Sequence, residues 1–261
     1  MTKPVIELRA ISHVYVTDRE ATLALQDINL KVEPGEFVSL VGPSGCGKTT
    51  LLSVMAGLLK PSTGEVLQDG KPLKAGSNKA GYMLQHDYLF PWRTILDNAL
   101  IGLELTKQLT KERIQKVKDL LDGMGLGGTW DLYPSQLSGG MRQRVALVRT
   151  LATDPEVLLL DEPFSALDYQ TKLQLEDLIV DTLRERKKTA VLVTHDLSEA
   201  IAVSDRVIVL AAHPGRIRTT FEIPKEIRET APFYARDQEG FAELFHQVWK
   251  ELEAEKEEVQ P

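Results

Sequence analysis

Residues 37–59 of this 261-residue chain, FVSLVGPSGCGKTTLLSVMAGLL, decide its fold. The apolar run at 37–41 predicts a buried strand, and residues 47–59 predict the helix that follows it. Between them stands GPSGCGKT, residues 42–49, which fits the pattern G-x-x-x-x-G-K-[ST] at every fixed position. Strand, glycine-rich turn and helix in this order form the context in which the pattern binds nucleotide phosphates, and a ligand-free glycine turn is the alternative.

The residues of this loop have separate expected roles. The glycines let backbone N–H groups turn toward the β- and γ-phosphates, and the helix start adds a positive field. Lys48 brings a point charge to the phosphates, and the Thr49 hydroxyl is placed to ligate Mg²⁺. Cys46 takes part through its backbone, and a redox role for its thiol is the alternative. The expected nucleotide-binding residues of the loop are Gly42, Pro43, Ser44, Gly45, Cys46, Gly47, Lys48, Thr49 and Thr50.

Two acids follow a second apolar run, VLLL at residues 157–160. Open α/β sheets place ligands at the carboxyl ends of their strands, so Asp161 and Glu162 are expected to face the phosphates. Asp161 is suited to hold Mg²⁺ through water, and Glu162 to polarise the attacking water as general base. His195 follows the run at 189–194 and should reach the γ-phosphate at the same edge. The alternatives are acids that only cap the next helix and a structural histidine.

A second helix start with glycines lies far from the first in the sequence, at LSGGMRQR, residues 137–144. Ser138 offers a hydroxyl, and Gly139 and Gly140 let a helix backbone approach an anion closely. Because no arginine finger is evident for the chain's own site, we expect this helix start to contact the γ-phosphate bound by a second copy. ATP would then hold two subunits together, and hydrolysis would loosen them.

These motifs in their order resemble the ABC ATPase family, and the resemblance covers residues 5–223. It is carried by the phosphate loop, Gln85, LSGG at 137–140, VLLLDE at 157–162, SALD at 165–168 and His195. It implies that Gln85 couples the metal and the attacking water to a helical subdomain, and that Asp168 communicates across a dimer. It further implies that His195 contacts the γ-phosphate and that Tyr15 packs against the adenine ring. A surface tyrosine on a strand is the alternative for Tyr15.

The resemblance also implies the fold and the site. The expected fold is an α/β P-loop ATPase core with a mostly parallel central sheet, an N-terminal antiparallel β portion and an inserted helical subdomain. The expected catalytic residues are Lys48, Gln85, Glu162 and His195, and the expected metal ligands are Thr49, Gln85 and Asp161. The expected cofactors are ATP and Mg²⁺.

The domain limits follow from changes of pattern along the chain. Helices broken by glycines replace the strand pattern between residues 91 and 138. We expect an ATP-binding domain at 5–236, with a core at 5–88 and 145–236 and a helical subdomain at 89–144. Residues 237–261 are expected to form an amphipathic helix with a frayed polar end, docked on its own core or, as the alternative, on a partner.

Two short segments point to a branch of the family. LFPWRTILDN at 89–98 and AAHPGRI at 211–217 resemble the importers of nitrate, sulfonates and taurine. In that branch Tyr88, Phe90 and Trp92 would contact a helix of a membrane permease, and packing within the domain is the alternative. The expected activity is hydrolysis of ATP to ADP and phosphate, coupled to uptake of a small solute. The expected assembly is a homodimer or pseudo-dimer of ATPase subunits on the permease, with a solute-binding protein as indirect partner.

Composition limits the other possibilities. The net charge of −7 argues against nucleic acid as a partner, because nucleic-acid binders usually have a basic surface. No apolar run is long enough to cross a membrane, so we expect a peripheral protein on the cytoplasmic face of the cell membrane. Two further hypotheses stay open: a soluble ABC ATPase of the iron–sulfur assembly type, and a nucleotide-dependent regulatory subunit with little turnover.

Overall fold

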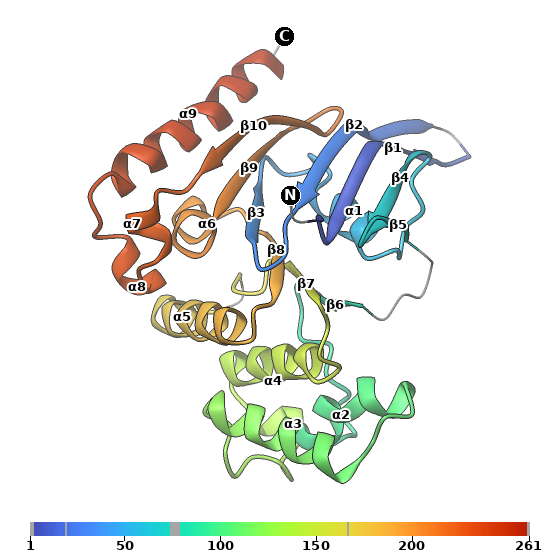
Figure 1. Ribbon diagram of the computed structural model, residues 1–261, viewed down its shortest axis with the longest axis vertical. Coiled ribbons are helices and arrows are strands. Elements are labelled where there is room, and N and C mark those ends of the chain that lie inside the picture. The colour runs from blue at the N-terminus through green and yellow to red at the C-terminus, as the bar shows by residue number, and fades with distance from the viewer. Residues whose placement is uncertain (1–2, 19, 74–78, 166, 260–261) are drawn as a thin grey trace.

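The computed structural model describes residues 3–18, 20–73, 79–165 and 167–259 (Figure 1). Ala166 of the SALD segment and Gln260 and Pro261 of the expected tail lie outside the described residues. The larger sheet has the strand order β10-β9-β3-β8-β7-β6 within these ranges. Its strands are β3 (Phe37–Val41), β6 (Ala80–Met83), β7 (Val157–Asp161), β8 (Thr189–Val193), β9 (Arg206–Ala211) and β10 (Arg216–Glu222).

The centre of this sheet is parallel. Every residue of β3, β7 and β8 is buried, as continuous apolar runs predict for strands covered on both faces. The pairs β6–β7, β7–β8, β8–β3 and β3–β9 are parallel, whereas β10 pairs with β9 in the antiparallel sense. The carboxyl ends of β6, β7, β8, β3 and β9 therefore meet at one edge of the sheet.

A second, antiparallel sheet holds the N-terminal part of the chain, as expected. Its order is β2-β1-β4-β5, from β1 (Ile6–Val16), β2 (Ala21–Val32), β4 (Thr63–Gln68) and β5 (Lys71–Pro72). Helix α1 (Lys48–Met55) shares an apolar core with both sheets. The helix expected over 47–59 ends earlier than predicted, because Gly57 adopts a left-handed backbone with a φ of 69°.

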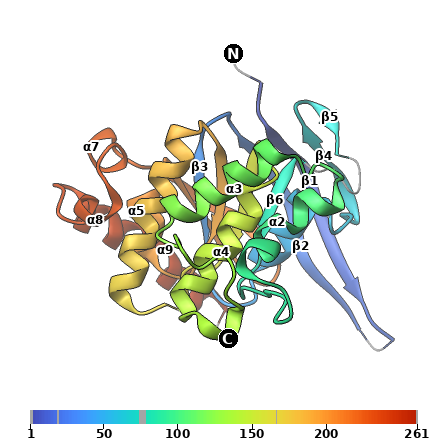
Figure 2. The same ribbon diagram turned by 90° about the horizontal axis from the view of Figure 1, so that it is seen from below.

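Three helices form a group at one end of the molecule, below the sheets in Figure 1, and Figure 2 views the molecule from that end. They are α2 (Ile95–Leu105), α3 (Lys111–Gly123) and α4 (Gly139–Leu151), and a short 3₁₀ turn, Pro134–Gln136, precedes α4. Thr94, Thr110 and Ser138 each cap the start of one of them with a side-chain oxygen. Helix α4 continues across residue 144, where the predicted subdomain limit falls, and that limit stays a prediction.

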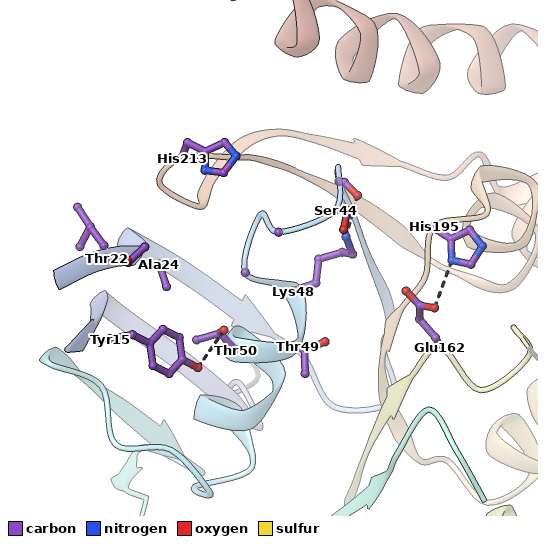
Figure 3. A pocket seen from close by; sticks show the side chains of 14 residues that line it. Tyr15, Thr22, Ala24, Ser44, Lys48, Thr49, Thr50, Glu162, His195 and His213 are labelled. Atoms are coloured by element: carbon purple, nitrogen blue, oxygen red, sulfur yellow. Dashed lines mark hydrogen bonds and ion pairs between the residues drawn. The ribbon is translucent and has the colours of Figure 1, made fainter. Parts of the chain in front are cut away.

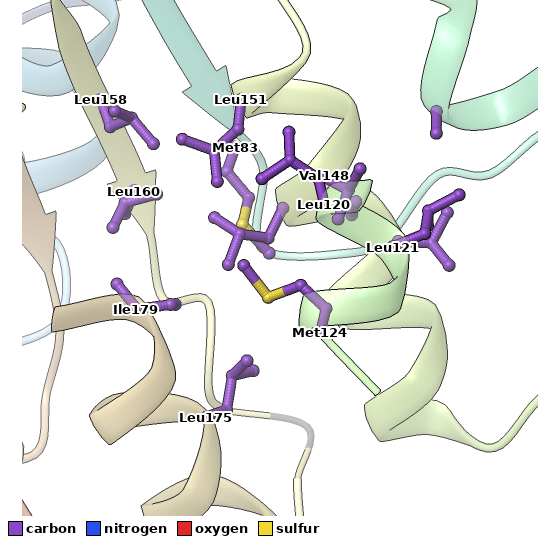
Figure 4. Close-up of a cluster of buried hydrophobic side chains, with 14 of the residues drawn as sticks. Met83, Leu120, Leu121, Met124, Val148, Leu151, Leu158, Leu160, Leu175 and Ile179 are labelled. Carbon is purple, nitrogen blue, oxygen red and sulfur yellow. The ribbon is translucent and has the colours of Figure 1, made fainter. Parts of the chain in front are cut away.

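An apolar cluster fixes these helices on the large sheet (Figure 4). Leu121 and Met124 come from the α3 region, and Val148 comes from α4. They pack in one cluster with Leu160 of β7 and with Ile179 of α5 (Tyr169–Glu185). The start of α4 is thus held by the same core that supports the strand ahead of the two acids.

The C-terminal part of the chain covers β3 and β9 on the same face of the large sheet as α4 and α5, whereas α1 covers the opposite face. The C-terminal part contains α6 (Leu197–Val203), α7 (Lys225–Arg228), α8 (Pro232–Ala235) and α9 (Phe241–Val259). Phe241, Leu244 and Val248 are buried, and α9 packs on α6 and β9, so the helix docks on its own core. Helix α9 continues to Val259 because Glu, Ala and Lys favour helix, and the expected fraying of residues 253–261 stays a prediction. None of the described helices is both long and apolar enough to cross a membrane.

Candidate active site

The candidate active site lies at the carboxyl edge of the large sheet (Figure 3). The phosphate loop follows β3, and Glu162 follows β7. Gln85 and His195 each come two residues after a strand, β6 and β8 respectively. Because these strands are parallel neighbours, residues far apart in the sequence meet at one edge.

A cavity of about 620 Å³ opens beside the phosphate loop, a size that suits a small-molecule ligand. It is lined by Tyr15, Thr22, Leu23, Ala24, Gly42, Ser44, Gly45, Gly47, Lys48, Thr49, Thr50, Glu162, His195 and His213. Expected site residues from four separate parts of the chain, namely Tyr15, the phosphate loop, Glu162 and His195, therefore share one cavity. Pro43 and Cys46 belong to the loop but do not line the cavity, and Cys46 is fully buried.

The loop folds around the ammonium group of Lys48. Its Nζ donates to the carbonyl oxygen of Gly42 at 2.7 Å and to that of Pro43 at 3.0 Å. Gly45 and Gly47 have φ values of 81° and 90°, which side-chain-bearing residues rarely adopt. Gly47 is also the N-cap of α1, with no side chain to occupy the helix start. The backbone N–H groups of that start are therefore left for a ligand in the cavity.

The Thr49 hydroxyl and the Asp161 carboxylate lie next to each other where Mg²⁺ is expected. Thr49 Oγ1 donates to Asp161 Oδ1 at 3.2 Å, and the hydroxyl of Tyr82 donates to Asp161 Oδ2 at 3.4 Å. Burial raises the pKa of the Asp161 carboxyl above its ordinary value, and burial raises the pKa of Tyr82 to about 12. Hydroxyl and carboxylate oxygens are hard ligands of the kind that Mg²⁺ prefers, and a divalent cation would compensate the buried charge of Asp161.

Glu162 lies between the other two expected catalytic side chains. Its Oε2 accepts a hydrogen bond from Gln85 Nε2 at 3.1 Å and lies 3.3 Å from His195 Nδ1 (Figure 3). Its backbone has a φ of 45°, a left-handed conformation that costs on the order of 1 kcal/mol for a residue with a side chain. Its N–H donates to the carbonyl of Val193 at 2.9 Å, and Ser165 Oγ donates to its carbonyl at 3.0 Å. These bonds hold the backbone in place.

Tyr15 lies at the end of the cavity away from Glu162 (Figure 3). Its hydroxyl is 3.2 Å from Thr50 Oγ1, and its ring meets the ring of His13 edge-on with centroids 4.7 Å apart. The side chain remains 44% exposed, so one face of the ring is open to a planar ligand.

The LSGG segment and Asp168 lie elsewhere. Ser138 caps α4, its Oγ accepting from the N–H of Met141 at 3.3 Å, and Ser138 and Gly139 are exposed. A Cβ on Gly140 would lie 2.5 Å from Thr171 Cγ2, so packing of α4 against α5 already requires that glycine. Asp168 caps α5 by accepting from Thr171 N–H at 3.0 Å, and this hydrogen bond lowers the pKa of its exposed carboxyl. None of these four residues lines the cavity.

Several residues of the site escaped the sequence analysis: Thr22, Leu23, Ala24 and His213 line the cavity, and Tyr82, which is not a lining residue, bonds to Asp161. His213 lines the cavity from the turn between β9 and β10, although the sequence analysis assigned it no chemical role. The rule that identified His195, a histidine just after a parallel strand, would also have found His213. Tyr82 lies within β6, where a tyrosine in a strand gives no sign that its hydroxyl reaches Asp161.

Comparison with known proteins gives consistent matches. A family model described as "ABC transporter" matches residues 25–165. The uncharacterized ABC transporter ATP-binding protein YtlC of Bacillus subtilis is 52% identical over 242 residues, covering 93% of each chain. The aliphatic sulfonates import ATP-binding protein SsuB of Bacillus cereus is 37% identical over 249 residues, covering 95% of this chain and 96% of that one.

A solved structure extends the match to three dimensions. The ATP-binding cassette MJ0796, in a dimeric post-hydrolysis state bound to ADP and Pi, has a TM-score of 0.75 to this chain at 32% identity. The match covers 84% of this chain and 99% of that one, so most of the fold is shared. The chain belongs to the ABC transporter family and is one of its ATP-binding ATPase subunits.

Proposed function

We propose that this chain is the ATP-hydrolysing subunit of an importer and energises uptake of a small solute of the nitrate, sulfonate or taurine class. One observation carries the hydrolytic part of the proposal. Glu162 Oε2 lies within 3.3 Å of both Gln85 Nε2 and His195 Nδ1 at the border of the cavity that the phosphate loop forms. A carboxylate held in this way can accept a proton from water at the γ-phosphate.

The other residues of the site have electrostatic roles in this proposal. Lys48 and the N–H groups at the start of α1 bind the phosphates, and Tyr15 packs on the adenine ring. Thr49 and Asp161 would hold Mg²⁺, with Gln85 as a further ligand, and the metal ion would neutralise the phosphate oxygens. His195 is placed to contact the γ-phosphate from the far side of Glu162. The hydrogen bonds to Glu162 fix its carboxylate for the attacking water.

We infer that the working form is a dimer of ATPase subunits with ATP between them. Ser138 and Gly139 are exposed at the start of α4 and lie outside the chain's own cavity, and Asp168 is exposed at the start of α5. A helix start attracts anions, so these groups are suited to the γ-phosphate of a second copy. The dimeric state of the solved relative supports this arrangement.

The importer part of the proposal rests on an aromatic surface and on the sulfonate-importer relative. Tyr88 and Trp92 are 59% and 72% exposed, and Phe90 is half-buried with its ring centroid 5.3 Å from that of Trp92. Arg149 holds this segment to α4 by donating to the carbonyls of Asp87 and Tyr88 at 2.7 and 3.0 Å. Exposed aromatic rings on a fixed backbone suit a partner helix from a permease at the cytoplasmic face of the membrane.

The test is recovery of partners from native membranes. Tagged Glu162→Gln is incubated with MgATP and detergent-solubilised membranes, and the bound proteins are identified. Recovery of a multi-spanning protein is expected, and its solute-binding protein would lead to the solute. When Trp92→Ala is added to the tagged variant, the multi-spanning protein should no longer be recovered. When Trp249→Ala is added instead, which alters an exposed tryptophan on α9, that protein should still be recovered. Recovery of soluble partners only would overturn the transport role and leave the ATPase assignment intact.

A further inference from the structure

Five charged side chains form a cluster outside the nucleotide cavity, in which Glu176 and Glu199 are buried and the side chain of Asp196 is 40% exposed. The cluster consists of Lys172, Glu176, Asp196, Glu199 and Arg236. They come from α5, from the loop that carries His195, from α6 and from the residue after α8. Figure 1 shows α8 beside α5, and α8 packs on both α5 and α6. The cluster thus joins the C-terminal segment of the chain to the loop of a catalytic residue.

Lys172 is the centre of the cluster. Its Nζ lies 2.7 Å from Asp196 Oδ2 and 2.7 Å from Glu199 Oε2. Asp196 is the neighbour of His195 in the chain and caps α6 by accepting from the N–H of Glu199 at 3.1 Å. Lys172 therefore fixes both ends of the turn that follows His195. Since Lys172 lies one helical turn after Asp168, it also connects this loop to the start of α5.

Glu176 competes for Lys172. Its side chain has no exposed surface, and its Oε1 lies 4.0 Å from Lys172 Nζ, beyond hydrogen-bond distance. That oxygen has no hydrogen-bond partner in the part of the chain that the structure describes. Arg236 satisfies the other oxygen, with Nη2 at 2.7 Å from Glu176 Oε2. A buried carboxylate that lost Arg236 would draw on Lys172, the nearest remaining cation.

The cluster contains more acidic than basic side chains. Three carboxylates share two cations, and burial raises the pKa of Glu199 to about 7 against the lowering effect of Lys172. Burial also raises the pKa of Glu176, again against its cation partners. Removal of either cation would leave an uncompensated charge in the interior, so the position of Lys172 depends on Arg236.

We propose that Arg236 is a positioning residue for ATP hydrolysis: by holding Glu176 it leaves Lys172 bound to Asp196 and Glu199, which fixes the loop that presents His195 to Glu162. The proposal gives the segment after β10 a role in the reaction, although that segment does not line the cavity. It rests on the proposed role of His195. Whatever displaces α8 from α5 would slow hydrolysis without entering the nucleotide site.

The test compares purified full-length variants in steady-state ATP hydrolysis. Arg236→Gln should lower kcat by about 3- to 30-fold, the range found for residues that act through a coupling network, with KM for ATP within about two-fold. Arg236→Lys should retain most of the activity because the cation is kept. The double variant Glu176→Gln/Arg236→Gln should recover kcat, since the buried carboxylate that competes for Lys172 is gone. A double variant as slow as Arg236→Gln would overturn the proposal.

Two controls separate this mechanism from loss of structure and from failure of the proposed function. Arg218→Gln removes a 2.9 Å ion pair between β10 and Glu251 of α9, outside the cluster, and should leave kcat unchanged. His195→Ala tests the underlying role: full activity there would refute the role of His195, whereas a slow His195→Ala beside a fully active Arg236→Gln would refute the coupling alone.

A second measurement does not depend on turnover. Amide hydrogen exchange at residues 194–199 should become faster in Arg236→Gln and return toward the wild-type rate in the double variant. Unchanged exchange in Arg236→Gln would contradict the proposal. If Arg236→Gln does not fold, Lys172→Gln takes its place, because it breaks the same path one step nearer to His195. Wild-type kcat and wild-type exchange in Lys172→Gln would then overturn the proposal.

Discussion

The helix starts at the phosphate loop and at the LSGG segment both carry glycines, and they face different environments. At the start of α1, Gly47 caps the helix without a side chain, and the surrounding loop encloses Lys48 beside the cavity. At the start of α4, the Ser138 side chain occupies the cap, and Ser138 and Gly139 are exposed away from that cavity. The first helix start belongs to a site that its own chain builds. The second has no site within the described part of the chain.

The two glycines of the second start also differ from each other. Gly140 is required by the fold, because any Cβ there would collide with Thr171 of α5. A Cβ on Gly139 would meet only Arg142 Nη2, at 3.9 Å, so nothing in the described chain demands a glycine. Gly139 is therefore the residue whose identity an external ligand explains best, and the expected contact of both glycines with an anion stays a prediction.

The largest effect on ATP hydrolysis is expected from two variants, each of which alters one of the two helix starts. Lys48→Ala and Gly139→Glu should each lower ATP hydrolysis by about 10²-fold or more, because each removes or opposes a charge at the phosphates. Mixing the two inactive variants should restore about a quarter of the wild-type rate, since half of the random dimers contain one intact shared site. A mixture as inactive as its components would show that the two helix starts do not share a site.

ATP binding by the separate chains provides the control for this experiment. Gly139→Glu should bind ATP as tightly as the wild type under conditions that keep the chain monomeric, because Gly139 does not line the cavity. Lys48→Ala should bind it weakly. Weak binding by the monomeric Gly139→Glu variant would mean that the second helix start acts on its own chain.

Alanine substitutions at Gly139 and Gly140 should show which of the two glycines the folded structure requires. Gly140→Ala should lower the free energy of unfolding by about 1–3 kcal/mol, because the added Cβ would lie 2.5 Å from Thr171 Cγ2. Gly139→Ala should change it by less than about 1 kcal/mol, since the position is open and alanine favours helix. Urea unfolding of the two variants measures both effects. Equal losses would remove the distinction between the two glycines.

A substitution at the end of the cavity where adenine is expected should have a smaller effect, on the affinity for ATP. Tyr15→Ala should weaken ATP binding by about 3- to 10-fold, the loss expected from removal of one stacked ring. Tyr133→Ala is a matched control, because Tyr133 is also 44% exposed but stands next to the second helix start. Its ATP affinity as a monomer, measured by calorimetry, should equal that of the wild type. An equal loss in both variants would contradict the adenine-packing role of Tyr15.

Two acids of the predicted site, Asp161 and Asp168, should change the stability of the chain with pH in opposite directions. The pKa of Asp161 is raised by burial, so its ionised form destabilises the folded chain, and this cost appears as pH rises above the ordinary value. In the absence of Mg²⁺, Asp161→Asn should therefore be more stable than the wild type near pH 7, and the gain should shrink toward pH 4.

The pKa of Asp168 is lowered by the hydrogen bond from Thr171, so its charge stabilises the folded chain above the ordinary pKa, and this is lost as pH falls. Asp168→Asn should accordingly be less stable than the wild type at pH 7, with a difference that narrows in acid. Thermal unfolding from pH 4 to 8 follows both variants. Parallel trends in the two would show that burial does not distinguish them.

Short-range signals account for what the sequence made predictable. The strands at 37–41 and 157–160 were found because both are continuous apolar runs, and the loop and the two acids follow directly after them. The strand-end rule then brought Glu162 and His195 to one edge without knowledge of the strand order. These inferences depended on residues that are adjacent in the sequence.

Long-range pairings account for what could not be predicted. Nothing within β3 specifies that its neighbours are β8 and β9, since that order is decided by packing of the whole chain. The same holds for the meeting of Lys172 with Arg236 by way of Glu176, because each side chain alone has the pattern of an ordinary surface charge. The helix end at Met55 and the continuation of α9 to Val259 depended on local backbone preferences that the apolar pattern does not record.

The position of β3 between β8 and β9 has a consequence for synthesis of the chain. The phosphate loop leaves the ribosome early, but the strand ahead of it gains its parallel neighbours only when residues 189–193 and 206–211 have followed. At ordinary translation rates that interval of roughly 150 residues lasts about 10–30 s. During it the nascent chain carries a strand that is apolar except for Ser39 and has both edges unpaired, so we expect ATP binding to begin, and the need for chaperone protection to end, only after residues 206–211 have been synthesised.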